Sequence, residues 1–488
     1  MLEDYFKSFR AKIIGINQTF KTPFGEQPII YADWTASGRM YKDIEDTLVN
    51  NFYPFVGNTH TETTVTGSGM TIAYHQAFQI IKTHVNASKK DVLITSDAGM
   101  TGVINKFQRI LGMKIHEKFK GRIDFSENDK PIVFVTHMEH HSNQTSWIET
   151  IADVVVIKAT ADGLVDVENL KELLVEYKDR VLKIAAVTSC SNVTGIFTPY
   201  HQIAEIMHQN DGLCFVDFAC SAPYIDIDMH PEKDAEKLDA IYFSPHKFLG
   251  GPGSSGVLIF NENLYKNTVP DAPGGGTVDW TNPWGEHAFV SNIEAREDGG
   301  TPGFLQTIRT ALAIQLKEQM TVPKMLEREE ELLAVVWDKM GALPNLHILA
   351  KNQQKRLGVI SFYIDDLHYN IAVKILNDRF GIQTRGGCSC AGTYGHYLLD
   401  VSQEYSGSIT CEISAGDLTH KPGWIRMSIH PTMTTAEINT VTDAIVALSK
   451  NHKEWSKDYE YDPNTNEFTY KFEGNLDIHK MVDGWFLN

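Results

Sequence analysis

Lys247 stands in a stretch whose residue types favour covalent chemistry by an amine. The apolar run 240–243 is rich in β-formers and predicts a buried strand, which ends in Ser-Pro-His-Lys247. The glycine-rich segment 250–253 then ends any regular element. A lysine at the end of a core strand is poorly placed for solvation, and a desolvated amine suits Schiff-base chemistry with an aldehyde. We therefore expect a reactive amine at Lys247; an ordinary surface lysine is the alternative.

Asp217 follows a second predicted strand, the apolar run 214–216. A carboxylate at a strand end is either a helix N-cap or the partner of a buried cation. The pyridinium nitrogen of pyridoxal phosphate needs such a partner, because the carboxylate keeps the ring protonated and able to take up electrons. The two strand ends together favour a pyridoxal-phosphate site over two ordinary strands with a capping aspartate.

A strand ending in Asp217, followed about thirty residues later by a strand ending in Ser-x-His-Lys247, resembles the fold-type I pyridoxal-phosphate enzymes, specifically the class V aminotransferase branch. The resemblance implies an α/β fold, with a mostly parallel sheet sandwiched by helices in a large domain and a smaller α+β domain. Strands and helical stretches alternate between about 90 and 260, which agrees with a sheet that binds ligands at its carboxyl edge. The implied cofactor is pyridoxal 5'-phosphate, bound by Lys247 with Ser244 and His246 beside it.

A phosphate-binding loop is expected after the predicted strand 91–95. A strand, a glycine-containing turn and a helix start expose backbone N–H groups to an anion. The family's Gly-Thr-Thr-Glu loop falls here on Gly99, Met100, Thr101 and Gly102. The match is partial, but a backbone amide binds phosphate whatever its side chain.

The run from His137 to Asn143 contains three histidines and a glutamate. This composition could suggest a metal site, but the adjacent His140 and His141 would seldom converge on one ion, so we expect no metal. The run resembles the Glu-His-His-Ala/Ser-Asn signature of cysteine desulfurases, which implies that His140 stacks on the cofactor ring and assists proton transfer. Similarly, Asn192 lies in a resembling Ser-Asn-Val-x-Gly turn, which implies a hydrogen bond to the cofactor's phenolic oxygen.

Arg426 lies inside the apolar run 423–429, where a buried charge needs an anion. A substrate carboxylate held bidentately is one candidate, matching the family's Arg-x-Ser site, and a protein carboxylate is the other. His60 lies in the polar loop 57–62, ahead of a helix expected from 70 to about 85. It is either a residue of the helix start or a substrate-binding group.

The glycine-rich loop from Arg385 to Gly392 carries Cys388 and Cys390. A metal would need further ligands, two inert cysteines are the bland alternative, and a thiolate near Arg385 would be activated by its charge. The loop resembles that of group II cysteine desulfurases, with Cys390 at the catalytic position, and that of molybdenum-cofactor sulfurase N-terminal domains. The resemblance implies removal of sulfur from L-cysteine through a Cys390 persulfide, giving L-alanine. An aminotransferase, lyase or epimerase on another amino acid, or a cofactor-free scaffold, are the alternatives.

The segments 271–278 and 297–302 are expected to be exposed turns without a local partner. In the resembled family the equivalent residues reach the phosphate of the neighbouring subunit, which implies cofactor binding by Thr277 and Thr301 in a homodimer with shared active sites. A sulfur-acceptor protein is the further partner that a persulfide would imply. Cys220 departs from the family pattern, because desulfurases commonly have a glutamine there, and the segment 392–422 is longer than usual.

The composition bounds these interpretations. With 62 acidic and 44 basic residues, the 488-residue chain carries a formal charge of −18, which argues against nucleic-acid or anionic-membrane partners. It has no apolar run of membrane-spanning length, no signal peptide and only six cysteines, so we expect a reducing, cytoplasmic setting. The expected parts are an N-terminal segment (1–27) packing with the small domain, a large cofactor-binding domain (28–305), a linker helix and small domain (306–450), and a hairpin-like extension (451–488).

Overall fold

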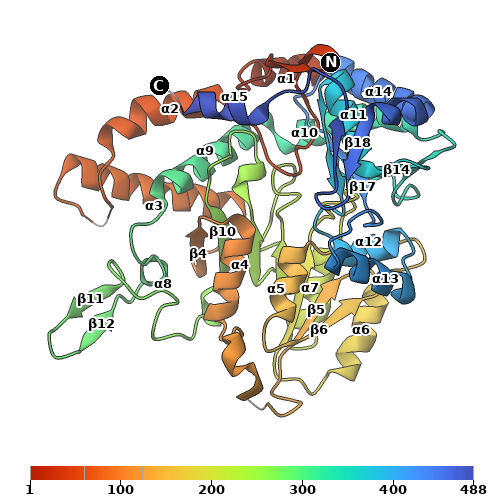
Figure 1. The fold of residues 1–488 in the computed structure, drawn as a ribbon. Coiled ribbons are helices and arrows are strands. Elements are labelled where there is room, and N and C mark those ends of the chain that lie inside the picture. The colour runs from red at the N-terminus through yellow and green to blue at the C-terminus, as the bar shows by residue number, and fades with distance from the viewer. Residues whose placement is uncertain (1, 60, 123–124, 487–488) are drawn as a thin grey trace. The chain divides into compact units, whose positions relative to one another are not determined.

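The computed structural model describes residues 2–59, 61–122 and 125–486, and it divides into two compact units (Figure 1). The first unit contains the chain up to residue 35, residues 193–195, and the chain from residue 326 onward. The second unit contains residues 36–192 and 196–325. Helix α10 (Val322–Met340) carries the chain from the second unit into the first.

The second unit is built on a seven-stranded sheet of order β4-β10-β9-β8-β7-β5-β6. Its strands are β4 (Asp91–Ser96), β5 (Ile132–Thr136), β6 (Asp153–Ile157), β7 (Lys183–Thr188), β8 (Leu213–Asp217), β9 (Ala240–Phe243) and β10 (Gly256–Asn261). Neighbours pair in parallel from β6 to β9, and β10 pairs antiparallel with both β9 and β4. Only β10 is therefore reversed, which confirms the mostly parallel sheet predicted from the sequence.

Helices cover this sheet because its strands are apolar on both faces. On one face α4 (Gly99–Ile110) and α5 (His141–Ile148) lie side by side, and their Phe107 and Trp147 join alternate strand residues in one core (Figure 1). Helix α7 (Tyr200–His208) packs against the sheet at β7 and β8. The remaining helices and strands of this unit are α2 (Lys42–Thr47), α3 (Val65–His84), α6 (Val167–Glu176), α8 (Ile293–Arg296), α9 (Phe304–Met320), β11 (Val278–Thr281) and β12 (His287–Phe289).

The first unit is a smaller α+β body, as the sequence predicts. Its four-stranded sheet has the order β13-β14-β17-β16, formed by β13 (Leu346–Ile348), β14 (Val359–Ile364), β16 (Arg385–Gly387) and β17 (Trp424–Ser428), all antiparallel. Helices α11 (Tyr369–Phe380) and α14 (Thr435–Trp455) pack on each other beside it. The smaller pieces are β1 (Thr19–Thr22) with β2 (Gly25–Pro28), β3 (Ile30–Tyr31) with β15 (Ile382–Gln383), the hairpin β18 (Tyr459–Asp462) with β19 (Glu467–Tyr470), and α15 (Ile478–Trp485).

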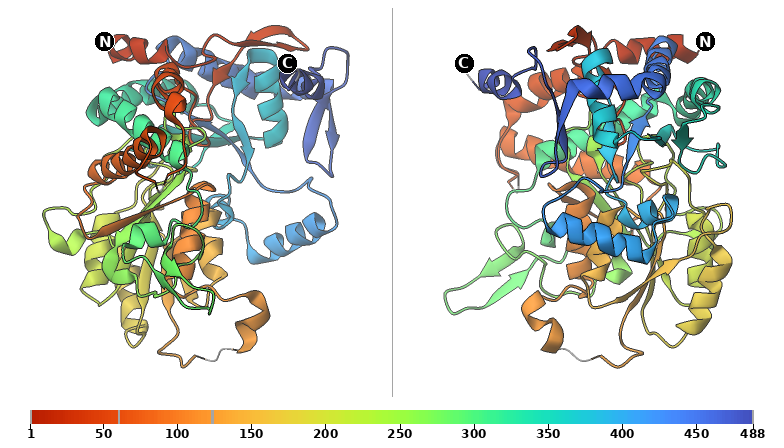
Figure 2. Two further views of the ribbon diagram at one scale, coloured as in Figure 1. Left: turned by 90° about the vertical axis from the view of Figure 1, so that its left-hand side faces the viewer. Right: turned by 45° about the vertical axis from the view of Figure 1, so that its right-hand side comes forward.

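Two short helices form an excursion between β16 and β17. Helix α12 (Gly392–Leu398) and helix α13 (Gln403–Ser414) project from the edge of the small sheet (Figure 2). Ser402 caps α13 by accepting a hydrogen bond from the Tyr405 amide. The excursion corresponds to the segment 392–422, which the sequence marks as unusually long.

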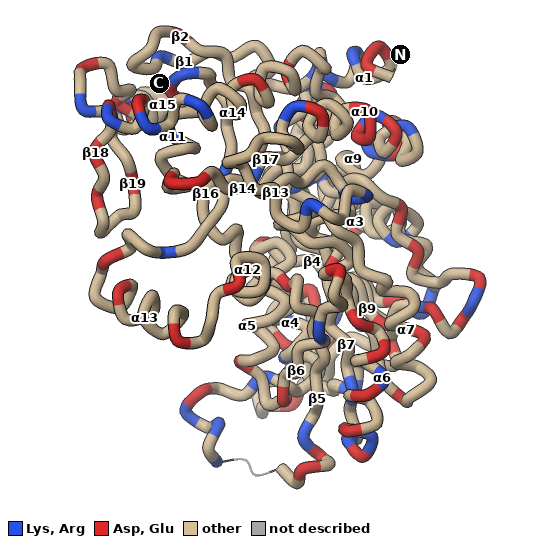
Figure 3. Tube along the Cα trace, turned by 90° about the vertical axis from the view of Figure 1, so that its right-hand side faces the viewer, with Lys and Arg blue, Asp and Glu red and all other residues tan. Residues whose placement is uncertain are grey.

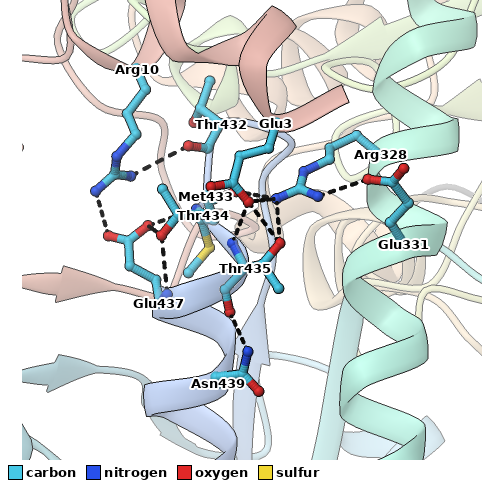
Figure 4. A network of polar contacts seen from close by, with 10 residues as sticks. All are labelled: Glu3, Arg10, Arg328, Glu331, Thr432, Met433, Thr434, Thr435, Glu437 and Asn439. Carbon is cyan, nitrogen blue, oxygen red and sulfur yellow. Dashed lines mark hydrogen bonds and ion pairs between the residues drawn. The ribbon is translucent and has the colours of Figure 1, made fainter. Parts of the chain in front are cut away.

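Helix α1 (Leu2–Arg10) is fastened to the start of α14 by charged groups (Figure 4). The Glu3 carboxylate accepts hydrogen bonds from the Thr435 amide (2.9 Å) and from Arg328 (2.9 Å). Arg10 pairs with Glu437, 2.6 Å away, which also closes a capping box with Thr434. A carboxylate at a helix N-terminus is favourable, and the Thr435 amide lowers the pKa of Glu3. Along the part of the chain that the structure describes, no helix is long and apolar enough to cross a membrane.

Candidate active site

Most of the residues predicted to bind the cofactor lie along one edge of the large sheet. The strands β5, β7, β8 and β9 run in the same direction, so their carboxyl ends lie along a common edge. His140 follows β5, Asn192 follows β7, Asp217 ends β8, and Lys247 follows β9. Ligands of parallel α/β sheets bind at this edge. The structure therefore brings these four residues together within the second unit.

Asp217 is a buried carboxylate with a defined orientation. Its side chain is 3% exposed and accepts a hydrogen bond from the Ala219 amide at 2.8 Å. Burial raises the pKa of Asp217 to about 6, although the Ala219 amide and the charge of Lys247 act in the opposite direction. A cationic partner would stabilise the buried carboxylate, and the pyridinium nitrogen of the cofactor is the partner expected from the sequence.

Lys247 closes a single 3-10 turn, Pro245–Lys247, at the end of β9. Burial, helped by the positive charge of Lys247, lowers the pKa of His246 to about 4, so this imidazole is neutral at physiological pH. Gly38 packs on the turn, donating its amide to the His246 carbonyl at 2.9 Å. A Cβ at Gly38 would lie 1.9 Å from the Phe248 carbonyl oxygen, so only glycine permits this approach. Lys247 is itself half-buried.

The predicted phosphate loop is the N-terminus of α4. Gly99 has a φ of +59°, and the next amide, that of Met100, donates to the Ser244 hydroxyl at 2.9 Å. A Cβ at Gly256, the first residue of β10, would lie 2.1 Å from the Gly99 carbonyl oxygen. Thr101 shares a 2.7 Å hydrogen bond with the Ser142 hydroxyl. The loop therefore combines a helix N-terminus with two hydroxyl groups, a combination that suits an anion.

The histidine-rich run does not converge on one point. His140 is the N-cap of α5, and its Nδ1 accepts a hydrogen bond from the Ser142 amide at 3.1 Å, which leaves the ring proton on Nε2. His137 instead lies 3.2 Å from the Gly163 carbonyl oxygen through its Nε2. Across the described ranges, no group of three or more His, Cys, Asp or Glu side chains is arranged to hold a metal ion.

Glu139 is a buried carboxylate whose importance the sequence does not reveal. It is fully buried, and burial raises its pKa to about 7. It accepts hydrogen bonds from the Thr136 hydroxyl (2.6 Å) and from the Thr188 amide (2.9 Å), which join the ends of β5 and β7. Because Glu139 immediately precedes His140, these hydrogen bonds fix the backbone position from which the His140 side chain extends.

Cys220 lies next to the segment that carries Asn192. Asn192 is 7% exposed and follows the strand β7. Cys220 is buried, and its thiol lies 3.7 Å from the Ser191 carbonyl oxygen. Cys220 thus occupies a buried position next to the segment that carries Asn192.

The turns at 271–278 and 297–302 are exposed at residues 272–276 and 299–301, as expected, but the expectation that they lack a local partner is wrong. The two loops bond to each other, with the Gly300 amide donating to the Gly275 carbonyl at 2.9 Å. Thr277 is fully buried and donates its hydroxyl to the Gly274 carbonyl at 2.7 Å, whereas Thr301 is exposed. The buried Glu297 carboxylate accepts from the Tyr265 hydroxyl at 2.7 Å. Glycines alone suggest exposure, but the polar side chains between them hold the loops in place.

The first unit places Arg426 and Arg385 opposite each other on β17 and β16. Both guanidinium groups contact Asp33: Arg426 at 2.8 Å to Oδ1 and Arg385 at 3.1 Å to Oδ2. The protein carboxylate that the sequence leaves open as a partner is therefore present. One carboxylate is therefore shared between two guanidinium groups. In the sequence, Asp33 ends a predicted strand (28–33) and precedes the small-residue segment 34–38, where the resembled family has a Leu-Asp-(Asn/Ser)-Ala-Ala turn near the active site.

The cysteine loop adopts a strained turn after β16. Cys390 is exposed, with a φ of +57°, and Cys388 is half-buried. A third thiol, Cys411, is exposed on α13. His60 falls outside the described residues, so its predicted role has no structural counterpart.

Comparison with known proteins finds a matching family and relatives with the same fold. The sequence model of the family described as Aminotransferase class-V matches residues 30–441. A probable cysteine desulfurase of Halalkalibacterium halodurans is 28% identical over 368 residues, covering 75% of this chain and 84% of the relative. One from Staphylococcus aureus is 29% identical over 368 residues, covering 74% and 83%.

Solved structures share the fold at lower sequence identity. A cysteine desulfurase of Thermococcus onnurineus superposes with a TM-score of 0.71 at 20% identity, covering 91% of this chain and 98% of that one. The cysteine desulfurase CsdA of Escherichia coli gives a TM-score of 0.71 at 21% identity, with the same coverage.

Proposed function

Because the chain belongs to the aminotransferase class-V family, we propose that it is a pyridoxal-phosphate enzyme that removes sulfur from L-cysteine, giving L-alanine and a persulfide on Cys390. The observation that carries the proposal is the pair of groups at adjacent strand ends. Asp217 ends β8, Lys247 follows β9, and the two strands are direct neighbours in the sheet. A buried carboxylate beside a half-buried amine is the donor set that pyridoxal phosphate requires.

The residues at the sheet edge fit the separate parts of this cofactor. The buried Asp217 carboxylate suits the pyridinium nitrogen, and Lys247 suits the aldehyde. The Met100 amide and the Ser244 hydroxyl, at the positive end of α4, suit the phosphate. His140, with its proton on Nε2, suits a ring-facing role. When bound, the cofactor supplies an electron sink for the substrate's α-carbon.

The chain's own groups then perform defined tasks. Asp217 holds the ring nitrogen protonated, and Lys247 Nζ carries a proton between positions on the substrate. Ser244 and the Met100 amide fix the phosphate, which orients the ring. We propose Asn192, His246, Gly99, Thr101, Thr277 and Thr301 as further cofactor contacts. His60 remains a proposed substrate contact.

The arginine cluster supports an amino-acid substrate. Arg385 and Arg426 share the Asp33 carboxylate, and Arg426 is 3% exposed. A buried guanidinium favours a second anion, and an amino-acid carboxylate can bind it through two parallel hydrogen bonds. The substrate would share the cluster with Asp33 or displace it from Arg426.

Cys390 is the group proposed to take the sulfur. Its thiol is exposed on a glycine-rich loop, and the curated relatives are named probable cysteine desulfurases. Its thiolate attacks the substrate sulfur, the carbon–sulfur bond breaks, and a proton replaces sulfur on the departing alanine. Cysteine plus an enzyme thiol therefore give alanine plus an enzyme persulfide, with no external oxidant.

A homodimer with shared sites is part of the proposal. Exposed apolar side chains gather between residues 49 and 72 in the second unit: Val49, Tyr53, Phe55, Val56, Val65 and Ile72. Such a concentration is typical of a surface that another protein covers. Sedimentation at several protein concentrations tests this, and a monomer throughout would contradict it. A sulfur-acceptor protein is the second proposed partner.

The reaction is tested by product analysis. Purified protein, loaded with pyridoxal phosphate, is incubated with cysteine and a panel of other amino acids under reducing conditions. The proposal predicts alanine and sulfide from cysteine. Keto-acid formation from another amino acid would instead indicate an aminotransferase, and failure to bind the cofactor would indicate a scaffold. Cys390→Ser should lose alanine formation, while the matched Cys411→Ser variant should retain it.

A further inference from the structure

The excursion between β16 and β17 encloses a cavity beside the cysteine loop. The hollow has a volume of about 160 Å³ and lies between α12, α13 and the start of β17. Leu399, Ile409, Ile413 and Trp424 give it a largely apolar lining. Cys388 also lines it, whereas Cys390 is exposed to solvent. The two thiols of one loop therefore have different environments.

Among the side chains that line the cavity, Cys388 is the nucleophilic thiol. The His396 imidazole is engaged through both nitrogens, by the Gly392 carbonyl at 2.8 Å and by the Ser406 hydroxyl at 2.8 Å, so it ties α12 to α13. Lys421 is the single Lys or Arg between residues 386 and 422, so the trace between β16 and β17 carries one blue stretch, beyond α13 (Figure 3). Lys421 also lines the cavity.

The backbone brings the two cysteines close together. The Ala391 amide donates to the Cys388 carbonyl at 3.0 Å, which closes a tight turn with Ser389 and Cys390 at its centre. Both central residues have positive φ, +51° and +57°, a conformation that strains residues other than glycine. Residues two apart are separated by at most about 7.6 Å between Cα atoms, and a closed turn shortens this distance. Exchange between the two sulfurs is therefore within reach.

We propose that Cys388 is a second sulfur-accepting residue, which receives the sulfane sulfur from Cys390 and holds it in the cavity. The proposal rests on the desulfurase function proposed above. The Cys388 thiolate attacks the outer sulfur of the Cys390 persulfide, and the sulfur–sulfur bond breaks. A persulfide forms on Cys388, and Cys390 leaves as a thiolate ready for another substrate. Atoms and electrons balance, because one thiolate replaces another.

The cavity gives this transfer a purpose. A persulfide on the exposed Cys390 is open to attack by any thiol in solution. Apolar walls admit the polarisable sulfane sulfur but disfavour charged thiolates from solvent, so a Cys388 persulfide is shielded. Stored sulfur would then pass to a partner that reaches the excursion.

The test locates the sulfur after a single turnover. Protein loaded with cofactor is mixed with substoichiometric cysteine, alkylated and digested with trypsin. Because trypsin does not cleave the Lys421-Pro422 bond, Cys388 and Cys390 fall in one peptide, residues 386–426, and its fragment ions identify the modified thiol. We expect the extra sulfur mainly on Cys388 in the wild type, only on Cys390 in Cys388→Ser, and on neither in Cys390→Ser. Extra sulfur confined to Cys390 in the wild type would overturn the proposal.

Two variants separate the cavity from the thiol. Ile413→Trp fills the hollow and should abolish the label on Cys388 while Cys390 is still labelled. Cys411→Ser removes a thiol that does not line the cavity and should leave the distribution unchanged. An unchanged distribution in Ile413→Trp would show that the cavity does not hold the sulfur.

The outcome also distinguishes this inference from the reaction on which it rests. If no alanine forms, the desulfurase proposal fails, and a brief pulse of inorganic polysulfide replaces cysteine as the sulfur source. Migration of the label from Cys390 to Cys388 after the pulse would support the transfer. Label that stays on Cys390 would refute it.

Discussion

Replacing Asp217 by asparagine should stabilise the cofactor-free protein while disabling the enzyme. The pKa of Asp217 is about 6 in the folded protein against an ordinary value of 3.8, because the carboxylate is buried. The folded state therefore binds this proton more tightly than the unfolded state does. The free energy of unfolding falls as the pH rises from about 4 to about 6, stays low above that, and is regained as the pH falls. At about 1.4 kcal/mol per pKa unit, the cost is about 3 kcal/mol at pH 8 and about half of that at pH 5. Asparagine removes the charge and keeps an oxygen for the Ala219 amide.

Urea unfolding of both cofactor-free proteins measures this difference. Asp217→Asn should be more stable by about 3 kcal/mol at pH 8, and the gap should shrink by about half at pH 5. Titration of the other groups cancels in the comparison. The matched control is Asp239→Asn, because the Asp239 carboxylate accepts from the Cys214 amide at 2.8 Å and pairs with His208 at 2.9 Å. That variant should lose stability. A gap equal at both pH values, or a less stable Asp217→Asn protein at pH 8, would refute the reasoning.

Three other substitutions test separate parts of the site. Lys247→Ala should abolish the covalent attachment of pyridoxal phosphate by borohydride, seen in peptide masses, whereas Lys106→Ala should retain it; a label persisting without Lys247 would disprove the assignment. Arg426→Lys should raise KM for cysteine about 10- to 100-fold with a smaller effect on kcat, because lysine lacks the bidentate fork, and an unchanged KM would remove this residue from the site. Ser244→Ala should weaken cofactor binding about tenfold in a fluorescence titration, because its hydroxyl orders the Met100 amide; an equal Kd would contradict this.

The strands of the large sheet could be predicted because each is an uninterrupted apolar run. The predicted strand 240–243 coincides with β9, and the predicted strand 214–216 lies within β8. A buried parallel strand must be apolar on both faces, so its first polar residue marks the carboxyl end. That rule is sufficient to assign Asp217 and Lys247 to the same edge of the sheet.

Helix boundaries were less accessible to prediction. The helix expected from residue 70 begins at Val65, because Thr64 caps it by accepting from the Gly67 amide at 3.2 Å. A local polar contact decides this boundary, whereas apolar periodicity shows only the middle of a helix.

Contacts between distant segments could not be predicted at all. Asp33 meets Arg426 across 393 positions of the sequence, and Glu297 joins two glycine-rich loops. Neither carboxylate belongs to a periodic pattern. The cavity beside Cys388 likewise depends on how α12 and α13 return to β17, which no local propensity specifies.

The measurement that tests the central claim most directly is alanine formation from cysteine in a single turnover. Wild-type protein and Cys390→Ser are each loaded with cofactor and mixed with cysteine under reducing conditions. The wild type should release alanine in an amount equal to the persulfide sulfur recovered on the protein. Cys390→Ser should still bind cysteine, because Lys247, Asp217 and Arg426 are intact, but it should release no alanine, since a hydroxyl is not a thiolate nucleophile. Alanine from Cys390→Ser at the wild-type rate, or keto acid without alanine from the wild type, would contradict the account.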